Sequence, residues 1–217
     1  MTSAWPWVAL ALLGAYHGLN PAMGWLFALA LGLQEKLRSA VIAALLPIAL
    51  GHAAAIALAI LLFHFLQRMV PMHALKWVVA AILFALGVYR LFRASHPRGS
   101  GMQVNRWELS VWSFLMASAH GAGLMVIPVL LAQPGLGMVH SMTDAMPSDT
   151  LQMSLSVILL AVLVHTGGML LVAGILAVAF FESYEKWGLR LLRHTWLNFD
   201  LIWALALLVA GFAALLP

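Results

Sequence analysis

Four histidines lie near the middle of four separate hydrophobic stretches, at positions His17, His52, His120 and His165. An ionisable side chain at bilayer depth is costly, and by default it marks an ion pathway, a proton relay or a cofactor site. Neutral imidazoles gathered within a few ångströms suit tetrahedral Zn²⁺, or Ni²⁺, Co²⁺ and copper ions, with metal–nitrogen distances of about 2.0 to 2.1 Å. We therefore predict that the four histidines form one metal site.

The expected site has no acidic ligand, because no carboxylate lies in the middle of any hydrophobic stretch and the nearest is Asp200. Four neutral ligands would leave a charge of +2 uncompensated in low dielectric. This deficit disfavours tight storage and favours a weak, transient site in a wet cavity, as conduction requires. Asn20 and Thr166 are predicted to supply hydrogen bonds around the ligands.

The composition predicts an all-α polytopic membrane protein that forms one integral membrane domain over residues 1–217, since 64% of the residues are hydrophobic and only 8% are charged. The absence of cysteine excludes disulfides, thiolate metal sites and cysteine nucleophiles. Basic residues flank the apolar spans, so the net charge of +4 indicates membrane topology rather than nucleic-acid binding.

Six apolar stretches are long enough to cross about 30 Å of hydrocarbon. Nine of the eleven Lys and Arg residues fall on one side of this arrangement. The positive-inside rule then predicts that these nine basic residues lie in the cytoplasm and that both termini lie outside. The stretches are 7–33, 40–66, 74–92, 109–132, 151–181 and 197–216.

The second half of the sequence repeats features of the first. His17-Gly18 and Gly51-His52 in the first half correspond to His120-Gly121 and His165 in the second. A duplicated unit of three helices enters the membrane from the other side, which predicts inverted three-helix repeats at 1–98 and 99–217. Pro21 removes a backbone donor just after His17, so we expect a kink or break in the first helix. Pro47 and Pro128 are each interpreted as ordinary prolines of a membrane helix, with a bend in the second and fourth helices as the alternative.

The pattern of His17 and Pro21 in the first helix and Gly51-His52 in the second, echoed at His120 and His165, resembles the lysine exporter superfamily, in particular its nickel/cobalt and heavy-metal branches. This resemblance implies a three-plus-three helix transporter with histidines and prolines in the first helix of each half. Segments such as 112–131 also look like those of prokaryotic polytopic membrane proteins, and this resemblance implies a location in a prokaryotic inner (cytoplasmic) membrane.

A divalent metal transporter is thus the preferred interpretation, with the metal ion and the lipid bilayer as partners and a homo-oligomer left open. One alternative is a bis-histidine haem protein for electron transfer. A second is a zinc-dependent intramembrane hydrolase, which lacks an obvious base, so an enzyme ranks below a transporter. The histidines could also simply make interhelical hydrogen bonds. Separately, Met138, His140, Met142 and Met146 in the 133–150 loop would suit Cu(I).

Overall fold

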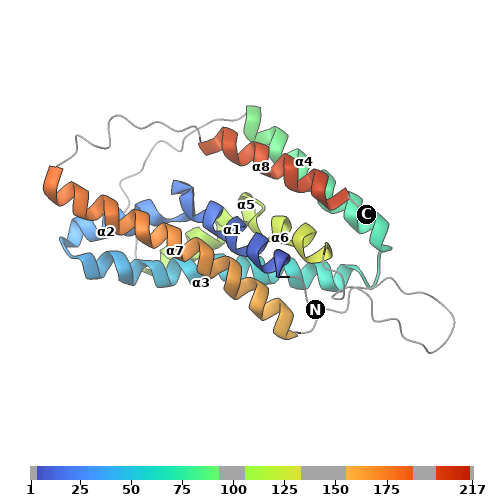
Figure 1. Ribbon diagram of the computed structural model, residues 1–217, viewed down its shortest axis with the longest axis horizontal. Coiled ribbons are helices and arrows are strands. Elements are labelled where there is room, and N and C mark those ends of the chain that lie inside the picture. The colour runs from blue at the N-terminus through green and yellow to red at the C-terminus, as the bar shows by residue number, and fades with distance from the viewer. Residues whose placement is uncertain (1–3, 93–105, 133–154, 188–198, 216–217) are drawn as a thin grey trace.

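A computed structural model describes residues 4–92, 106–132, 155–187 and 199–215, and these form eight α-helices and one 3-10 turn with no strand among them (Figure 1). The all-α prediction is confirmed for this part of the chain. The elements are α1 (Trp5–Leu19), η1 (Pro21–Met23), α2 (Trp25–Glu35), α3 (Arg38–Leu66), α4 (Met72–Phe92), α5 (Arg106–Ala119), α6 (Ala122–Leu131), α7 (Leu155–Trp187) and α8 (Phe199–Leu215).

Three of the described helices are long and apolar enough to cross a membrane: α3, α4 and α7. The pair α5 and α6 passes the same test jointly and is bent by 55°, so it makes a fourth span if it is a single broken crossing. Several apolar helices of this length identify a membrane protein. The first and fourth predicted stretches are not single helices, and a count of six spans stays a prediction.

The first predicted stretch breaks at the residues that follow His17. The Asn20 side chain accepts a hydrogen bond from the Ala22 backbone N–H at 3.0 Å, and Pro21 begins the short turn η1. Gly24 then adopts φ +114°, a left-handed conformation that an L side chain rarely takes, and it lies against Ile48 of α3. The predicted break in the first helix is therefore confirmed, and it separates α1 from α2.

The second break falls at His120 and Gly121 rather than at a proline. Gly121 adopts φ +69° and starts α6. Pro128 lies inside α6, and Pro47 lies inside α3, which continues unbroken to Leu66. The helix breaks at the glycine because its left-handed conformation reverses the local path of the backbone, whereas proline removes only one donor and is tolerated inside a membrane helix.

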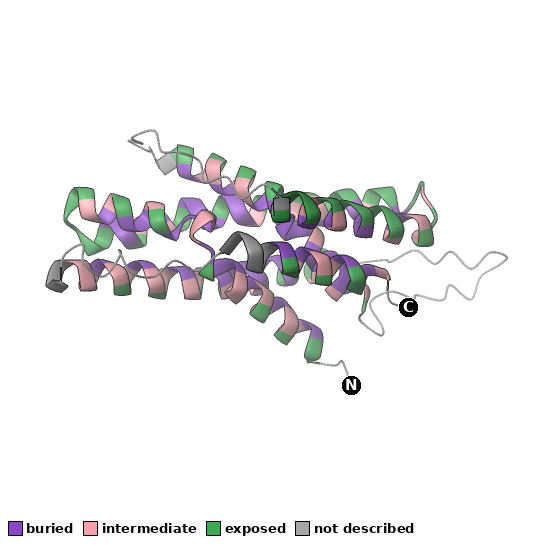
Figure 2. Ribbon diagram, turned by 90° about the horizontal axis from the view of Figure 1, so that it is seen from above, coloured by how far each residue is buried: buried purple, intermediate pink, exposed green. Residues whose placement is uncertain are grey.

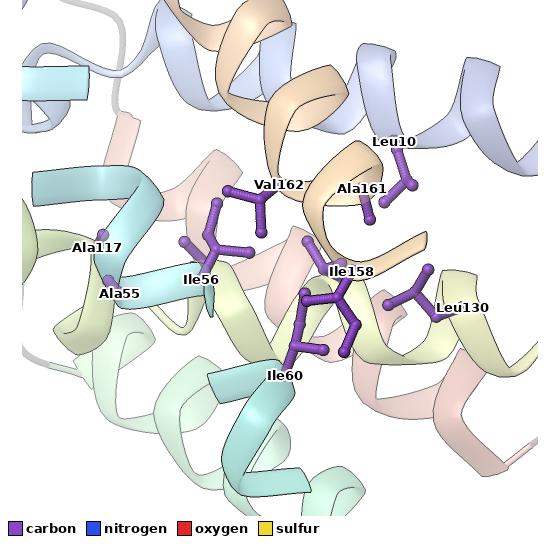
Figure 3. Packing of buried hydrophobic residues seen from close by; sticks show 11 residues of the cluster. Leu10, Ala55, Ile56, Ile60, Ala117, Leu130, Ile158, Ala161 and Val162 are labelled. Carbon is purple, nitrogen blue, oxygen red and sulfur yellow. The ribbon is translucent and has the colours of Figure 1, made fainter. Parts of the chain in front are cut away.

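The helices pack as three reciprocal pairs around a shared interior. Helix α1 lies along α7, α5 lies along α3, and α4 lies along α8 on one side of the molecule (Figures 1 and 2). One apolar cluster joins α1, α3, α6 and α7 through Leu10, Ile56, Leu130 and Ile158 (Figure 3).

Glycines let the paired backbones come unusually close. A Cβ built on Gly14 of α1 would meet the His165 carbonyl oxygen of α7, and one built on Gly51 of α3 would meet the Ser110 carbonyl oxygen of α5. Small residues at such positions are typical of helix contacts in membranes. These two contacts fix the positions of α1 on α7 and of α3 on α5, which carry the predicted site residues.

Candidate functional site

Three of the four predicted histidines meet in the interior: His17 of α1, His52 of α3 and His165 of α7, together called the histidine triplet here. Each is 0% exposed. Their ring centroids are separated by 4.9 Å for His17 and His165, and by 5.6 Å for each of the other two pairs. Residues 35 to 148 positions apart in sequence are thus brought into ring contact by the packing of three helices.

His17 and His120 are oriented by the same local hydrogen bond. The His17 Nδ1–H donates to the Leu13 carbonyl at 2.8 Å, and the His120 Nδ1–H donates to the Met116 carbonyl at 2.7 Å. A carbonyl can only accept, so Nδ1 carries the proton in each neutral ring and Nε2 keeps its lone pair. Metal-binding histidines are commonly held in this way by a carbonyl.

The rings of His52 and His165 lack such a hydrogen bond. Neither ring nitrogen of either residue has a hydrogen-bond partner within the described chain. The Leu10 backbone carbonyl lies near the His165 ring, but not at hydrogen-bonding geometry. A neutral imidazole has one donor and one acceptor nitrogen, and leaving them unsatisfied in an apolar interior is costly.

His120 lies at the α5–α6 break and is 1% exposed. It is close enough to His17 for charges on the two rings to interact. The break places it at the end of α5, next to the left-handed Gly121. The four predicted residues are therefore all buried, and three of them are in mutual ring contact.

The two predicted supporting residues have separate environments. Asn20 is buried and its side-chain oxygen caps η1, so its observed task is to stabilise the helix break. Thr166 follows His165 on α7 and is also buried, and its hydroxyl makes no hydrogen bond within the described residues.

No described carboxylate lies near the triplet in sequence or along a helix. Glu35 ends α2, Glu108 begins α5, and Glu182 near the end of α7 pairs with Arg38 at 3.2 Å. The Asp200 side chain and the methionine-rich segment of the 133–150 loop lie outside the described residues.

The four histidines do not form a ready-made metal site. Within the described ranges, no group of three or more His, Asp or Glu side chains is arranged to hold an ion. One reason is visible in the rings: those of His52 and His165 are stacked with only 4° between their planes. An ion bound by imidazole lies in the ring plane, so two stacked rings cannot share one ion without turning.

Sequence reasoning did not single out two polar groups near the site. The Ser110 hydroxyl of α5 donates to the Pro47 carbonyl of α3 at 2.9 Å. Tyr16 lies beside His17, with ring centroids 6.3 Å apart. In the sequence, these two groups could have been found from a serine within an apolar stretch (Ser110) and from an aromatic residue adjacent to a mid-stretch histidine (Tyr16). Ser113, placed by sequence on a helix-contact face, donates to the Ile48 carbonyl at 2.7 Å.

Comparisons of the chain with protein families, with curated proteins and with solved structures found no match.

Proposed function

We propose that this protein is a membrane transporter for a divalent transition-metal ion, and that the ion binds between the rings of the histidine triplet with His120 as a fourth ligand. The observation that carries the proposal is the contact of three fully buried imidazoles from three helices at centroid separations of 4.9 to 5.6 Å.

These separations match what a shared ion requires. With a metal–nitrogen distance of about 2.0 to 2.1 Å, the centroid of each bound imidazole lies about 3.2 Å from the ion, and two such rings at the tetrahedral angle are about 5.2 Å apart. The three observed separations bracket this value. The centroid separations are therefore compatible with a shared ion, which the three rings would bind after a change of orientation.

The hydrogen bonds suggest which rings turn. His17 and His120 are restrained through Nδ1 and present Nε2 as the ligand atom. No hydrogen bond within the described residues restrains the rings of His52 and His165. We therefore assign His17 and His120 as fixed ligands and His52 and His165 as ligands that rotate onto the ion. A site that closes on binding and opens on release suits transient occupancy.

The reciprocal packing supports the inverted repeat that this transporter would use. Helix α1 lies on α7 of the other half, and α5 lies on α3 of the first half. Each half has one broken helix with a histidine at the break, fixed by the same Nδ1 bond to the carbonyl four residues earlier. In inverted-repeat transporters, broken helices at the repeat interface form the ion site.

Ring geometry favours an ion over haem. Axial imidazoles on opposite sides of a haem iron would have centroids about 6 Å apart with the macrocycle between them. The triplet rings are closer than this and in direct contact. A hydrolase would need a base near the metal, and the described carboxylates Glu35, Glu108 and Glu182 lie at helix ends away from the triplet.

We further propose that the chain lies in a prokaryotic inner membrane with both termini outside. The Arg38–Glu182 pair joins the start of α3 to the end of α7 at the basic end of the molecule. The start of α1 and the end of α8 meet at the opposite end, where they line one cavity. Basic residues at one end are typical of the cytoplasmic side.

The proposal is tested by elemental analysis of the purified protein, after equilibration with Zn²⁺, Ni²⁺ or Co²⁺, beside a His52→Ala, His165→Ala double variant. With the ion kept in the equilibration buffer, wild-type protein should bind close to one ion per chain, and the double variant should bind none. His73→Ala, at an exposed position at the start of α4, is the matched control and should keep the ion. Equal metal content in wild type and double variant would overturn the proposed site.

A further inference from the structure

Two adjoining cavities, of about 340 and 410 Å³, form one crevice between α1, α6 and α8. They share Ala9, Pro128, Val129 and Ala213 as walls. Cavities of this size are in the range that proteins use for small ligands. None of the four histidines lines this crevice, and the inference drawn from it does not rest on the transport site proposed above.

The crevice has the length and direction of one membrane leaflet. Along α1 it extends from Trp5 to Tyr16, which is about 16 Å at the rise of an α-helix. Half of a hydrocarbon core of about 30 Å is nearly the same length. Its inner end at Tyr16 lies beside His17, the residue expected at mid-depth. A crevice of this length would reach from one membrane surface to about the middle of the bilayer.

The two ends of the crevice differ in polarity. Its inner part is lined almost entirely by apolar side chains, among them Leu13, Met125 and Ala210. The outer part includes the cation of Lys76 and the indole of Trp5, at the ends of α4 and α1. Lys and Trp at this depth are typical of the lipid headgroup region. An elongated apolar slot with a cation at its mouth complements an anionic amphiphile.

We propose that the crevice binds one anionic phospholipid of the outer-facing leaflet, with an acyl chain along α1 and α8 and the phosphate on Lys76. Leu12 and Val209 line the crevice and are 61% and 68% exposed, so its rim is continuous with the apolar surface that faces lipid. The acyl chain that fills the crevice would lie between α1 and α8 without polar contacts. Lys76 would make binding selective for lipids with an anionic headgroup.

Native mass spectrometry of the full-length protein in detergent tests this, with a phosphatidylglycerol and a phosphatidylcholine of identical acyl chains as probes. Wild type should retain one phosphatidylglycerol in preference to phosphatidylcholine. Lys76→Gln should reduce that preference about fivefold, the effect of roughly 1 kcal/mol per basic residue. Lys36→Gln, at the opposite end beyond α2, is the charge-matched control and should have no effect.

Occupancy of the crevice itself is tested by Ala213→Phe, which fills the slot from an exposed wall position. This variant should lose the tightly held molecule of both lipids, whereas Ala30→Phe, at an exposed position on α2, should keep it. Retained lipid in Ala213→Phe, or an equal response of the two lysine variants, would mean annular lipid only and overturn the proposal. Metal content is independent of these outcomes and reports on the histidine site alone.

Discussion

Replacement of Gly14 by alanine tests the packing that brings His17 to His165. The added Cβ would overlap the His165 carbonyl oxygen, and the next neighbours are backbone atoms of α7, which cannot rotate away. Ordinary contact for a Cβ begins at 3.4 Å, so α1 and α7 would have to separate by about 1.4 Å. Metal sites tolerate deviations of only about 0.2 Å, so metal binding should be lost as well as stability.

The expected magnitude follows from two opposing effects. Overpacking of this kind costs about 1 to 3 kcal/mol. Alanine in place of glycine within a helix returns up to about 1 kcal/mol. Gly167→Ala isolates the second effect, because a Cβ at Gly167 on α7 would meet nothing within 4 Å. We expect Gly14→Ala to be less stable than Gly167→Ala by about 1 to 3 kcal/mol.

Both variants can be unfolded by titration of mixed micelles with a denaturing detergent, followed by circular dichroism, with metal content measured on the same samples. Gly167→Ala should match or exceed the stability of the wild type and keep its ion. If Gly14→Ala is as stable as Gly167→Ala, then α1 does not lie on α7 at the distance described, and the contact of His17 with His165 fails with it.

Three further perturbations have distinct expected outcomes. Ser113→Ala removes the interhelical bond to Ile48 and should cost about 0.6 to 1.7 kcal/mol in the same titration, whereas Ser118→Ala removes only a bond within its own exposed turn and should cost less; equal costs would argue against the α3–α5 contact. Protons and the ion compete for the same imidazole nitrogens, so the pH at which acid releases half of the bound metal should fall as the metal concentration rises, and a release pH that does not depend on metal concentration would contradict histidine ligation. Because the chain has no cysteine, single cysteines report topology directly: Met69→Cys should react with an impermeant maleimide in intact cells and Leu37→Cys only after lysis, and the opposite pattern would reverse the orientation.

Much of the fold could be predicted because a bilayer leaves few options. Runs of about 20 apolar residues must be helical in lipid, and this placed α3, α4 and α7 within a few residues of their bounds. The break after His17 followed from Pro21, whose ring cannot continue the hydrogen-bond ladder. The break at Gly121 could not be predicted from proline, because a left-handed glycine leaves no signal in hydropathy.

The burial of the four histidines could be predicted from the sequence, but the orientations of their rings could not. Depth alone identified His17, His52, His120 and His165, and all four are buried. The stacked rings of His52 and His165 depend on side-chain torsions that sequence does not encode locally. The capping by Asn20 was also out of reach, because an asparagine near a histidine reads equally well as a ligand-supporting group.

X-ray absorption at the metal edge of the zinc- or nickel-loaded protein tests the central claim most directly. The account predicts a first shell of three or four nitrogens at about 2.0 to 2.1 Å, for zinc, with the outer-shell scattering of imidazole, and loss of that signal in the His52→Ala, His165→Ala variant. A first shell of sulfur or of oxygen without imidazole scattering would place the ion elsewhere and contradict a transport site built from the histidine triplet.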